Sequence, residues 1–146
     1  MLIPSVFHVG GLRATINPEF VSELSFKPGA YGADYGRSLG GIVDIKLRMP
    51  KAERAHGSVT LDLIDGSVTI EGALTKKLHV AAGARVSWIS AFIPLFNRSN
   101  FRISPFYWDY QLALRYLPTP RDDVNVLIFG STDDLDVSVQ NPDPAT

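Results

Sequence analysis

Residues 78–88 read Leu-His-Val-Ala-Ala-Gly-Ala-Arg-Val-Ser-Trp, and this stretch decides the fold class of the chain. Apolar side chains occupy every second position, ending with Trp88, while the intervening positions hold small or polar residues such as Arg85. Strict alternation is typical of a β-strand with one apolar and one polar face. We therefore predict a strand at Leu78–Ile89.

Four further stretches extend this prediction to a series of antiparallel strands. We expect strands at Ser58–Leu63 and Ser67–Leu74, joined by a hairpin turn at Asp65-Gly66, a dipeptide that favours tight turns. A less regular strand is expected at Val124–Ser131. The strand before it carries its large apolar side chains on one face: Trp108, Tyr110, Leu112, Leu114 and Tyr116.

The region before residue 50 has a different character. Glycines recur through it, and only two short stretches predict strands, at Val21–Phe26 and Ile42–Leu47. Met49-Pro50-Lys51 is expected to be a connection, because proline interrupts regular structure. We therefore divide the chain into a glycine-rich part, residues 1–49, and a part with the first strands of a larger sheet, residues 50–146.

Composition and motifs disfavour several classes of function. The 146 residues carry 14 basic and 15 acidic side chains, so no basic excess favours nucleic acid. Cysteine is absent, which excludes disulfides and zinc-thiolate sites. No catalytic triad, phosphate-binding loop or paired-acid motif stands out, so we expect neither an enzyme nor a cofactor or metal site. No run of about 18 apolar residues predicts a transmembrane helix, although alternating barrel strands leave only a weak hydropathy signal.

Alternation alone fits two architectures, a soluble antiparallel β-sandwich acting as a binding module and a part of a transmembrane β-barrel. The positions opposite the aliphatic rows favour the barrel, because several of them are charged: Asp62, Glu71, Arg85, Asp109 and Arg115. A barrel with a filled or wet interior needs such an inward face, whereas its apolar face meets lipid.

The connections between the strands fit the barrel as well. If the first strand rises from the periplasm, the turns at Thr75–Lys77 and Leu117–Asp123 are periplasmic. The long stretch Ser90–Phe106 is then external, as expected of outer-membrane barrels, and its two prolines predict irregular structure. Trp88 and Trp108 lie near one rim, where an interfacial aromatic girdle is expected.

One run in the glycine-rich part contains an ordered set of features. It reads Phe26-Lys27-Pro28-Gly29-Ala30-Tyr31-Gly32-Ala33-Asp34-Tyr35-Gly36-Arg37-Ser38-Leu39-Gly40-Gly41-Ile42-Val43-Asp44-Ile45. A Tyr-Gly pair, a double glycine and a closing apolar strand follow one another, which resembles the end of the plug domain in TonB-dependent receptors. Lys27-Pro28-Gly29 stands where that family most often has Arg-Gly-Pro. The structural residues of the motif are Pro28, Gly29, Tyr35, Gly36, Gly40 and Gly41.

The resemblance implies a bacterial outer-membrane receptor for energy-coupled uptake of a scarce ligand, such as a metal chelate, a cofactor or a glycan. Its partners would be outer-membrane lipid, an unknown small-molecule ligand and a TonB-type energy-coupling protein, whose contact segment is absent from this chain. Such receptors close roughly 22 strands around a plug. We therefore expect the chain to be an incomplete piece, with the end of a mixed plug and about five barrel strands, and the missing secretory signal agrees with this.

Two further sets of residues follow from this interpretation. Asn97, Arg98, Asn100 and Arg102 are candidates for lining the external ligand entrance, although a solvated loop has the same composition. The charges of Arg13, Arg37 and Lys46 are expected to pair with Asp62, Glu71 or Asp109. An acidic stretch is expected to be a hydrated loop, or alternatively a site for a cation such as calcium: Asp133, Asp134 and Asp136.

Overall fold

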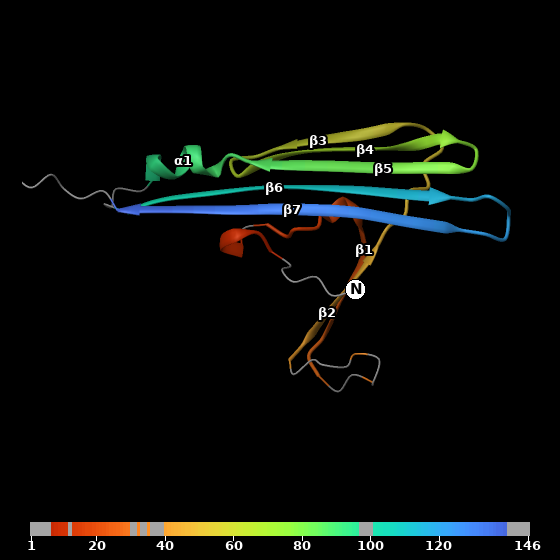
Figure 1. Ribbon diagram of the computed structural model, residues 1–146, viewed down its shortest axis with the longest axis horizontal. Helices are drawn as coiled ribbons and strands as arrows, with labels where there is room; N and C mark the ends of the chain where they lie inside the picture. The colour runs from red at the N-terminus through yellow and green to blue at the C-terminus, as the bar shows by residue number, and fades with distance from the viewer. Residues whose placement is uncertain are drawn as a thin grey trace, which may run out of the picture.

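The computed structural model describes residues 7–11, 13–29, 32, 35, 40–96 and 101–139. These residues are mainly β, with two antiparallel sheets and one α-helix. The first sheet is a hairpin of β1 (Val21–Lys27) and β2 (Ile42–Leu47). The second sheet contains five strands side by side in chain order (Figure 1): β3 (His56–Leu61), β4 (Asp65–Thr75), β5 (Leu78–Ser87), β6 (Phe101–Tyr116) and β7 (Val124–Val139).

Residues 7–20, which we call the N-terminal segment, lie along one face of the five-stranded sheet (Figure 1). The segment contains two short 3-10 helices, η1 (Val9–Gly11) and η2 (Pro18–Phe20). The side chain of Asn17 caps η2 by accepting a hydrogen bond from the backbone N–H of Glu19 at 3.0 Å. The β1–β2 hairpin follows and projects away from the larger sheet.

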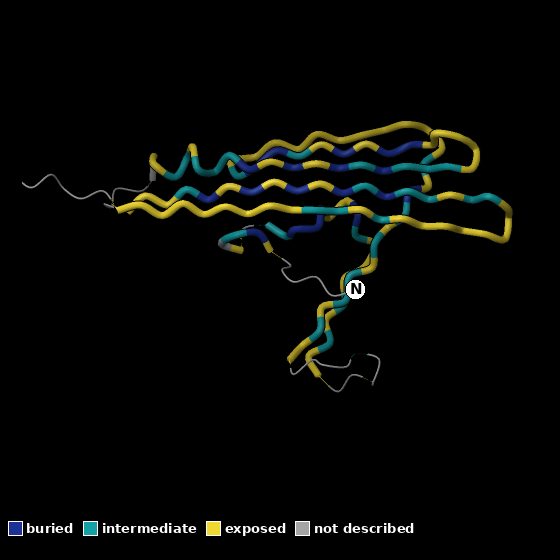
Figure 2. The backbone as a smooth tube through the Cα atoms, in the orientation of Figure 1, coloured by how far each residue is buried: buried dark blue, intermediate teal, exposed yellow. Residues whose placement is uncertain are grey.

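Buried and more exposed residues alternate along β4, β5 and β6 (Figure 2), as expected of strands whose side chains point to two faces in turn. The face that meets the N-terminal segment, which we call the inner face, takes the odd-numbered positions of β4 to β6, including the buried residues Glu71, Arg85 and Asp109. Even-numbered positions point to the opposite, outer face. The faces predicted for the strand at Leu78–Ile89 and for the strand with Trp108 and Tyr116 are therefore confirmed.

The outer face remains exposed although most of its side chains are apolar. Val59 is 70% exposed and Ile70 is 59% exposed, and no second layer of described residues covers them. Other large apolar side chains of this face are also exposed: Leu61, Val68, Val86, Trp108, Tyr110, Val126 and Ile128. The sheet therefore reverses the polarity that is usual in a globular protein.

The buried apolar core is small and lies between the N-terminal segment and the inner face. Phe20 of η2 packs with Ala81 of β5 and Ala113 of β6, and the half-buried Leu127 borders them. A Cβ atom at Gly83 would lie 2.8 Å from the Phe20 ring, so this position accepts only glycine without a shift. Small residues on neighbouring strands thus form a socket for one aromatic ring.

The first hairpin of the large sheet turns earlier than predicted. Asp65 and Gly66 open β4, and residues 62–64 form the connection instead. The carboxylate of Asp62 accepts hydrogen bonds from the backbone N–H groups of Ile64 at 2.7 Å and Asp65 at 3.0 Å, which replaces a glycine-dependent turn. Gly66 serves close packing, because a Cβ atom there would overlap the Trp88 ring.

The prediction of an irregular stretch at Ser90–Phe106 is wrong for most of it. Residues 89–96 form α1 (Ile89–Phe96), and β6 already begins at residue 101. The backbone N–H of Tyr107 donates to Ser87 Oγ at the end of β5. The nitrogen of Pro105, two residues earlier in β6, faces the same side, where β5 has already ended. A proline is tolerated there because no hydrogen bond to a neighbouring strand is lost.

The last strand is longer than expected. β7 runs to Val139 rather than Ser131, because it pairs with β6 in unbroken register from Tyr116↔Val124 to Phe101↔Val139.

The short turn predicted between β4 and β5 is confirmed. Thr75 Oγ1 accepts hydrogen bonds there from the backbone N–H groups of Lys77 and Leu78. Among the described residues, no α-helix combines the length and apolar character needed to cross a bilayer.

Candidate functional site

The N-terminal segment binds the inner face mainly through charged and polar side chains, and His8 is the centre of the first cluster. Its Nε2 lies 3.1 Å from a carboxylate oxygen of Asp109, and its Nδ1 lies 2.8 Å from one of Asp133. The buried imidazole also stacks on Tyr107, with 4.3 Å between ring centroids. Asp133 accepts a further hydrogen bond from the backbone N–H of Val9 at 3.0 Å. One histidine therefore connects the segment to both β6 and β7.

Arg85 of β5 extends this cluster to a third strand. Its Nε donates to Asp109 at 2.7 Å, and its Nη2 donates to the backbone carbonyl of Ala14. Gln111 of β6 donates to the carbonyl of Thr15 at 3.2 Å. The N-terminal segment has little regular structure, so its own backbone does not provide hydrogen bonds for these carbonyl groups. The buried side chains of Arg85 and Gln111 provide them, and burying the carbonyl groups without a partner would be costly.

A second cluster surrounds Arg13. Its Nε donates to the buried carboxylate of Asp65 at 2.9 Å, its Nη2 pairs with Asp62, and the hydroxyl of Tyr107 donates to Asp65 as well. Hydrogen bonds from the backbone N–H groups of Asp65 and Ile64, together with Arg13, lower the pKa of Asp62. The predicted pairing of Arg13 with Asp62 is confirmed.

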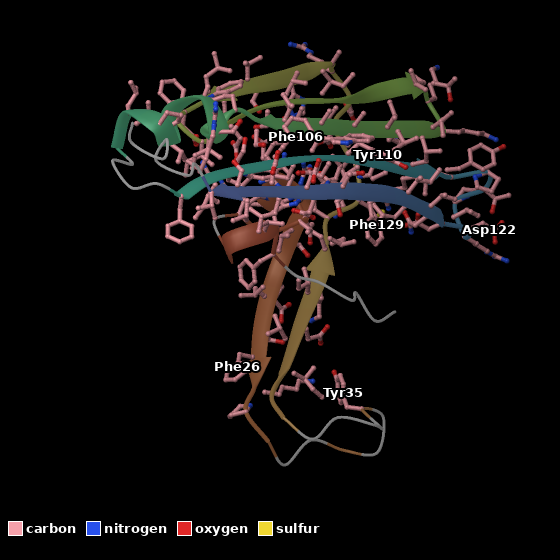
Figure 3. All side chains as sticks on the ribbon, turned by 60° about the vertical axis from the view of Figure 1, so that its left-hand side comes forward. Phe26, Tyr35, Phe106, Tyr110, Asp122 and Phe129 are labelled. Carbon is pink, nitrogen blue, oxygen red and sulfur yellow. The ribbon has the colours of Figure 1, made fainter. Side chains whose placement is uncertain are left out.

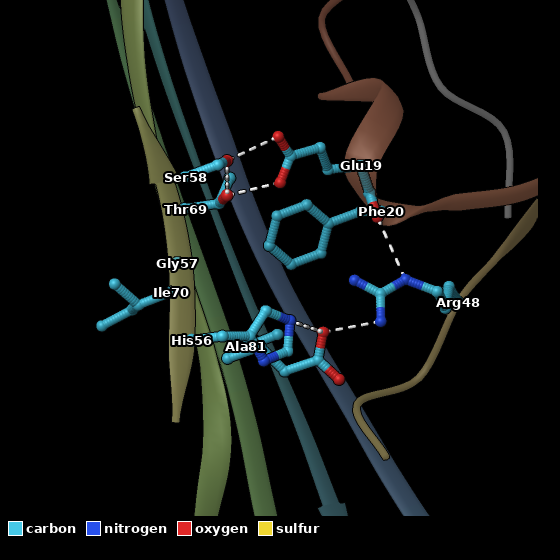
Figure 4. A pocket seen from close by; sticks show the side chains of 10 residues that line it. Glu19, Phe20, Arg48, His56, Gly57, Ser58, Thr69, Ile70 and Ala81 are labelled. Carbon is cyan, nitrogen blue, oxygen red and sulfur yellow. Dashed lines mark hydrogen bonds and ion pairs between the residues drawn. The ribbon is translucent and has the colours of Figure 1, made fainter. Parts of the chain in front are cut away.

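Glu19 anchors the end of the segment on β3 and β4 (Figure 4). Its carboxylate accepts hydrogen bonds from Thr69 Oγ1 and, at 2.7 Å, from Ser58 Oγ. These two hydroxyl donors, Thr69 first, lower the pKa of Glu19. The contact therefore favours the ionised carboxylate.

Glu71 of β4 holds the connection between the two sheets. It accepts from Arg48 Nη1 at 2.6 Å and from the backbone N–H groups of Lys51 at 2.9 Å and Ala52 at 3.2 Å. Three donors thus converge on a side chain that is nearly buried. Glu71 is paired as expected, but with a residue that the sequence interpretation did not name.

Two expectations about charges are wrong. Lys46 does not reach the large sheet, because it lies on the projecting hairpin and pairs with Glu23 across β1 and β2 at 2.8 Å. The acidic stretch is not a loop but part of β7, where Asp133 faces inward and Asp134 and Asp136 face outward. Arg37 lies outside the described residues.

Two cavities lie in the interface. The larger, of about 370 Å³, is lined by Arg13, Arg85, Asp62, Asp65 and Glu19 among others, and all five of these charged side chains have a partner. The smaller, of about 80 Å³, lies beside Phe20 (Figure 4). The charged side chains that line the larger cavity can hold water or polar groups by hydrogen bonds. Among the described residues, no group of three or more His, Asp or Glu side chains is arranged so that it could hold a metal ion.

Tyr35 of the glycine-rich motif lies at the far end of the β1–β2 hairpin (Figure 3). Lys27 Nζ donates to the Tyr35 hydroxyl at 2.5 Å and lies 4.0 Å from the centroid of its ring. The same hydroxyl donates to Asp44 of β2 at 3.3 Å. Tyr35 therefore ties the connection between the strands to both of them.

The other motif positions are placed as follows. Pro28 and Gly29 follow β1 and are exposed, as is Gly40. A Cβ atom at Gly41 would lie 2.6 Å from the exposed Phe26 ring, so a larger residue there would displace that ring. Gly36 lies outside the described residues.

The structure describes one of the four candidates for the ligand entrance. Asn97, Arg98 and Asn100 lie outside the described residues. Arg102 lies in β6 rather than in a loop, exposed, and shares the outer face with Trp108.

The main contacts that sequence reasoning missed come from His8 and Arg48. Neither stands in a recognisable motif, and each meets its partners only through pairing between distant segments. No protein-family model matches the chain, and searches of curated proteins and of solved structures found no match.

Proposed function

We propose that the chain is part of a TonB-dependent receptor of the bacterial outer membrane. In this proposal the first 49 residues end a plug domain, and β3 to β7 begin a transmembrane β-barrel. The observation that carries the proposal is the reversed polarity of the large sheet, with exposed aliphatic rows outside and buried charges inside. Lipid stabilises such an outer face, and a plugged interior accepts such an inner face.

The dimensions and edges of the sheet support the membrane assignment. β4 and β5 contain 11 and 10 residues, the length at which a tilted strand crosses a bilayer. Neither edge strand, β3 or β7, has a second neighbour among the described residues. Further barrel strands would remove these open edges, which otherwise promote aggregation.

The interface between the segment and the sheet supports the plug assignment. Ion pairs and hydrogen bonds dominate it, and Phe20 supplies most of its small apolar core. An energy-coupling protein that pulls on the plug would therefore expose little apolar surface. Ligand uptake would follow without covalent chemistry, and the ligand is a small scarce molecule of unassigned class.

The alternative, a soluble β-sandwich binding module, requires a second sheet over the aliphatic rows. The described residues supply none on the outer face. This favours lipid as the neighbour of that face.

Vesicle flotation tests the proposal. The whole chain, purified in detergent and mixed with phosphatidylcholine vesicles, is expected to float with them and to resist a high-salt wash. Ile70→Asp combined with Ile128→Asp should abolish flotation, whereas Lys76→Asp, in the exposed β4–β5 turn, should not. A chain that is monomeric in detergent-free buffer and does not float would overturn the proposal in favour of the sandwich.

A further inference from the structure

The polarity of the β6–β7 hairpin changes at one level along its length. Between Tyr116↔Val124 and Trp108↔Thr132 the outer face is apolar. Beyond Trp108, Phe106 is the last large apolar side chain of that face. The outer positions that follow are charged or hydroxylated: Arg102, Ser104, Asp134, Asp136 and Ser138.

Apolar side chains do not disappear beyond this level but move to the other face. Register between β6 and β7 continues without a bulge, so the exchange lies in the sequence and not in the backbone. The exposed apolar residues of the inner face there are Phe101, Ile103, Leu135, Val137 and Val139. We call residues 101–107 and 133–139 the β6–β7 ribbon.

Three other features mark the same level. One row of paired residues crosses all five strands: Leu61, Gly66, Val86, Trp108 and Thr132. β3 ends in this row, β4 begins one residue before it and β5 ends one residue after it, so only β6 and β7 continue (Figure 1). Two exposed aromatic rings also lie beside this row: Trp108 stacks on Tyr110, with 5.9 Å between the ring centroids.

Resting on the proposed membrane function, we infer that the hydrocarbon region of the bilayer ends at the level of Trp108 and Thr132. The β6–β7 ribbon projects beyond it into water, and lipid contacts only the outer face below it. From Trp108 to Tyr116 the strand has about nine residues, enough for a tilted crossing. Arginine at mid-bilayer on a lipid-facing strand costs about 2–4 kcal/mol, so the row with Arg102, Asp134 and Asp136 belongs outside.

The inference predicts lipid contacts that differ from those expected from side-chain hydropathy alone. Val137 is 56% exposed and apolar, yet it lies on the ribbon and should not contact lipid. Ile128 is 47% exposed on the same strand and should contact lipid. Val137 lies on the inner face beyond the Trp108 row and Ile128 lies on the outer face below it, so position in the sheet, and not side-chain hydrophobicity, decides which one contacts lipid. Ser104 and Ser138, on the outer face of the ribbon, test the level of the row itself.

Single-cysteine variants test this directly, because the chain has no cysteine of its own. Val126→Cys, Ile128→Cys, Ser104→Cys, Ser138→Cys and Val137→Cys are labelled with an environment-sensitive fluorophore in phosphatidylcholine vesicles. Lys76→Cys in the β4–β5 turn serves as an aqueous control. A lipid-borne spin-label quencher should quench positions 126 and 128 several-fold more than 104, 137 and 138, and aqueous iodide should give the opposite order.

The outcomes separate the inference from the proposal beneath it. If the ribbon positions are quenched by lipid as strongly as 126 and 128, the boundary is wrong while the membrane assignment stands. If 126 and 128 are reached only by iodide, both fail. Lipid quenching at 126 and 128 alone supports both.

Discussion

The two faces of the five-stranded sheet differ in how their side chains are stabilised. On the inner face, buried charges are matched one by one: Asp109 contacts both Arg85 and His8, and Glu71 accepts three hydrogen bonds. On the outer face, no layer of described residues lies over the aliphatic and aromatic side chains. The buried charges of the inner face have their partners within the described part of the chain, whereas no described residue covers the apolar side chains of the outer face.

The difference between the two faces predicts which substitutions change the free energy of unfolding only when the sheet is in lipid. Buried ion pairs are sensitive to removal of one partner, because the other charge is left without compensation. Exposed aliphatic rows gain free energy only when an apolar medium replaces water. Substitutions on the inner face should therefore act in any medium that keeps the fold, and those on the outer face should act only in lipid.

The largest effect is expected from Asp109→Ala, which leaves Arg85 and His8 buried without their shared carboxylate. Removing one partner of a buried pair costs about 3–5 kcal/mol. Denaturant unfolding of the chain in vesicles measures the loss. Asp136→Ala, on the exposed outer side of β7, is the control, and an equal loss in both variants would contradict the role of the cluster.

Ile128→Arg tests the outer face. In vesicles we expect a loss of about 2–4 kcal/mol, because the charge would enter hydrocarbon. Asn125→Arg, on the inner side of the same strand and near its end, should cost much less. Denaturant unfolding in vesicles compares the two variants, and similar losses would mean that the outer face does not meet lipid.

Gly83→Ala should detach the N-terminal segment from the sheet without disturbing the strands. The added methyl would lie 2.8 Å from the Phe20 ring, and overpacking of this kind costs about 1–3 kcal/mol. Hydrogen exchange should become faster at residues 13–20 and stay unchanged in β5. Ala84→Val, next in sequence but on the outer face, is the control, and it should leave exchange in the segment unchanged.

Acid should give the smallest effect, a gradual loosening of the segment. Glu19 has a lowered pKa in the folded chain, so its contribution is present above the ordinary glutamate pKa and is lost as the pH falls through the lowered value. Hydrogen exchange of residues 13–20, measured at falling pH and corrected for the intrinsic rate, follows this loss. Glu19→Gln should remove part of the pH dependence, and an unchanged profile would contradict the assigned contact.

Much of the large sheet follows from the sequence because alternation fixes both the strands and their faces. The faces of β5 and β6 were predictable from Leu78 and Trp108 onward, since a period of two leaves no ambiguity once the strand is recognised. The register of β7 with β6 was not predictable. Its apolar pattern changes face beyond Thr132, so local alternation fades although pairing continues to Val139.

Contacts between distant segments were the least predictable part. Arg13 was expected to pair with the sheet and does so, but the sequence carries no signal for the contacts of His8 with Asp109 and Asp133. Lys46 looked equivalent to Arg13 by charge alone. Only the projection of the β1–β2 hairpin away from the sheet separates the two.

The most direct test of the account is a map of lipid contact along β5. A photoactivated carbene dissolved in the bilayer, read out by mass spectrometry, should label Val80, Ala82, Ala84 and Val86 and leave Ala81, Gly83 and Arg85 unlabelled. A period of two with this phase is the predicted result. Uniform labelling, or labelling of the odd-numbered positions, would contradict the assignment of the aliphatic face to lipid.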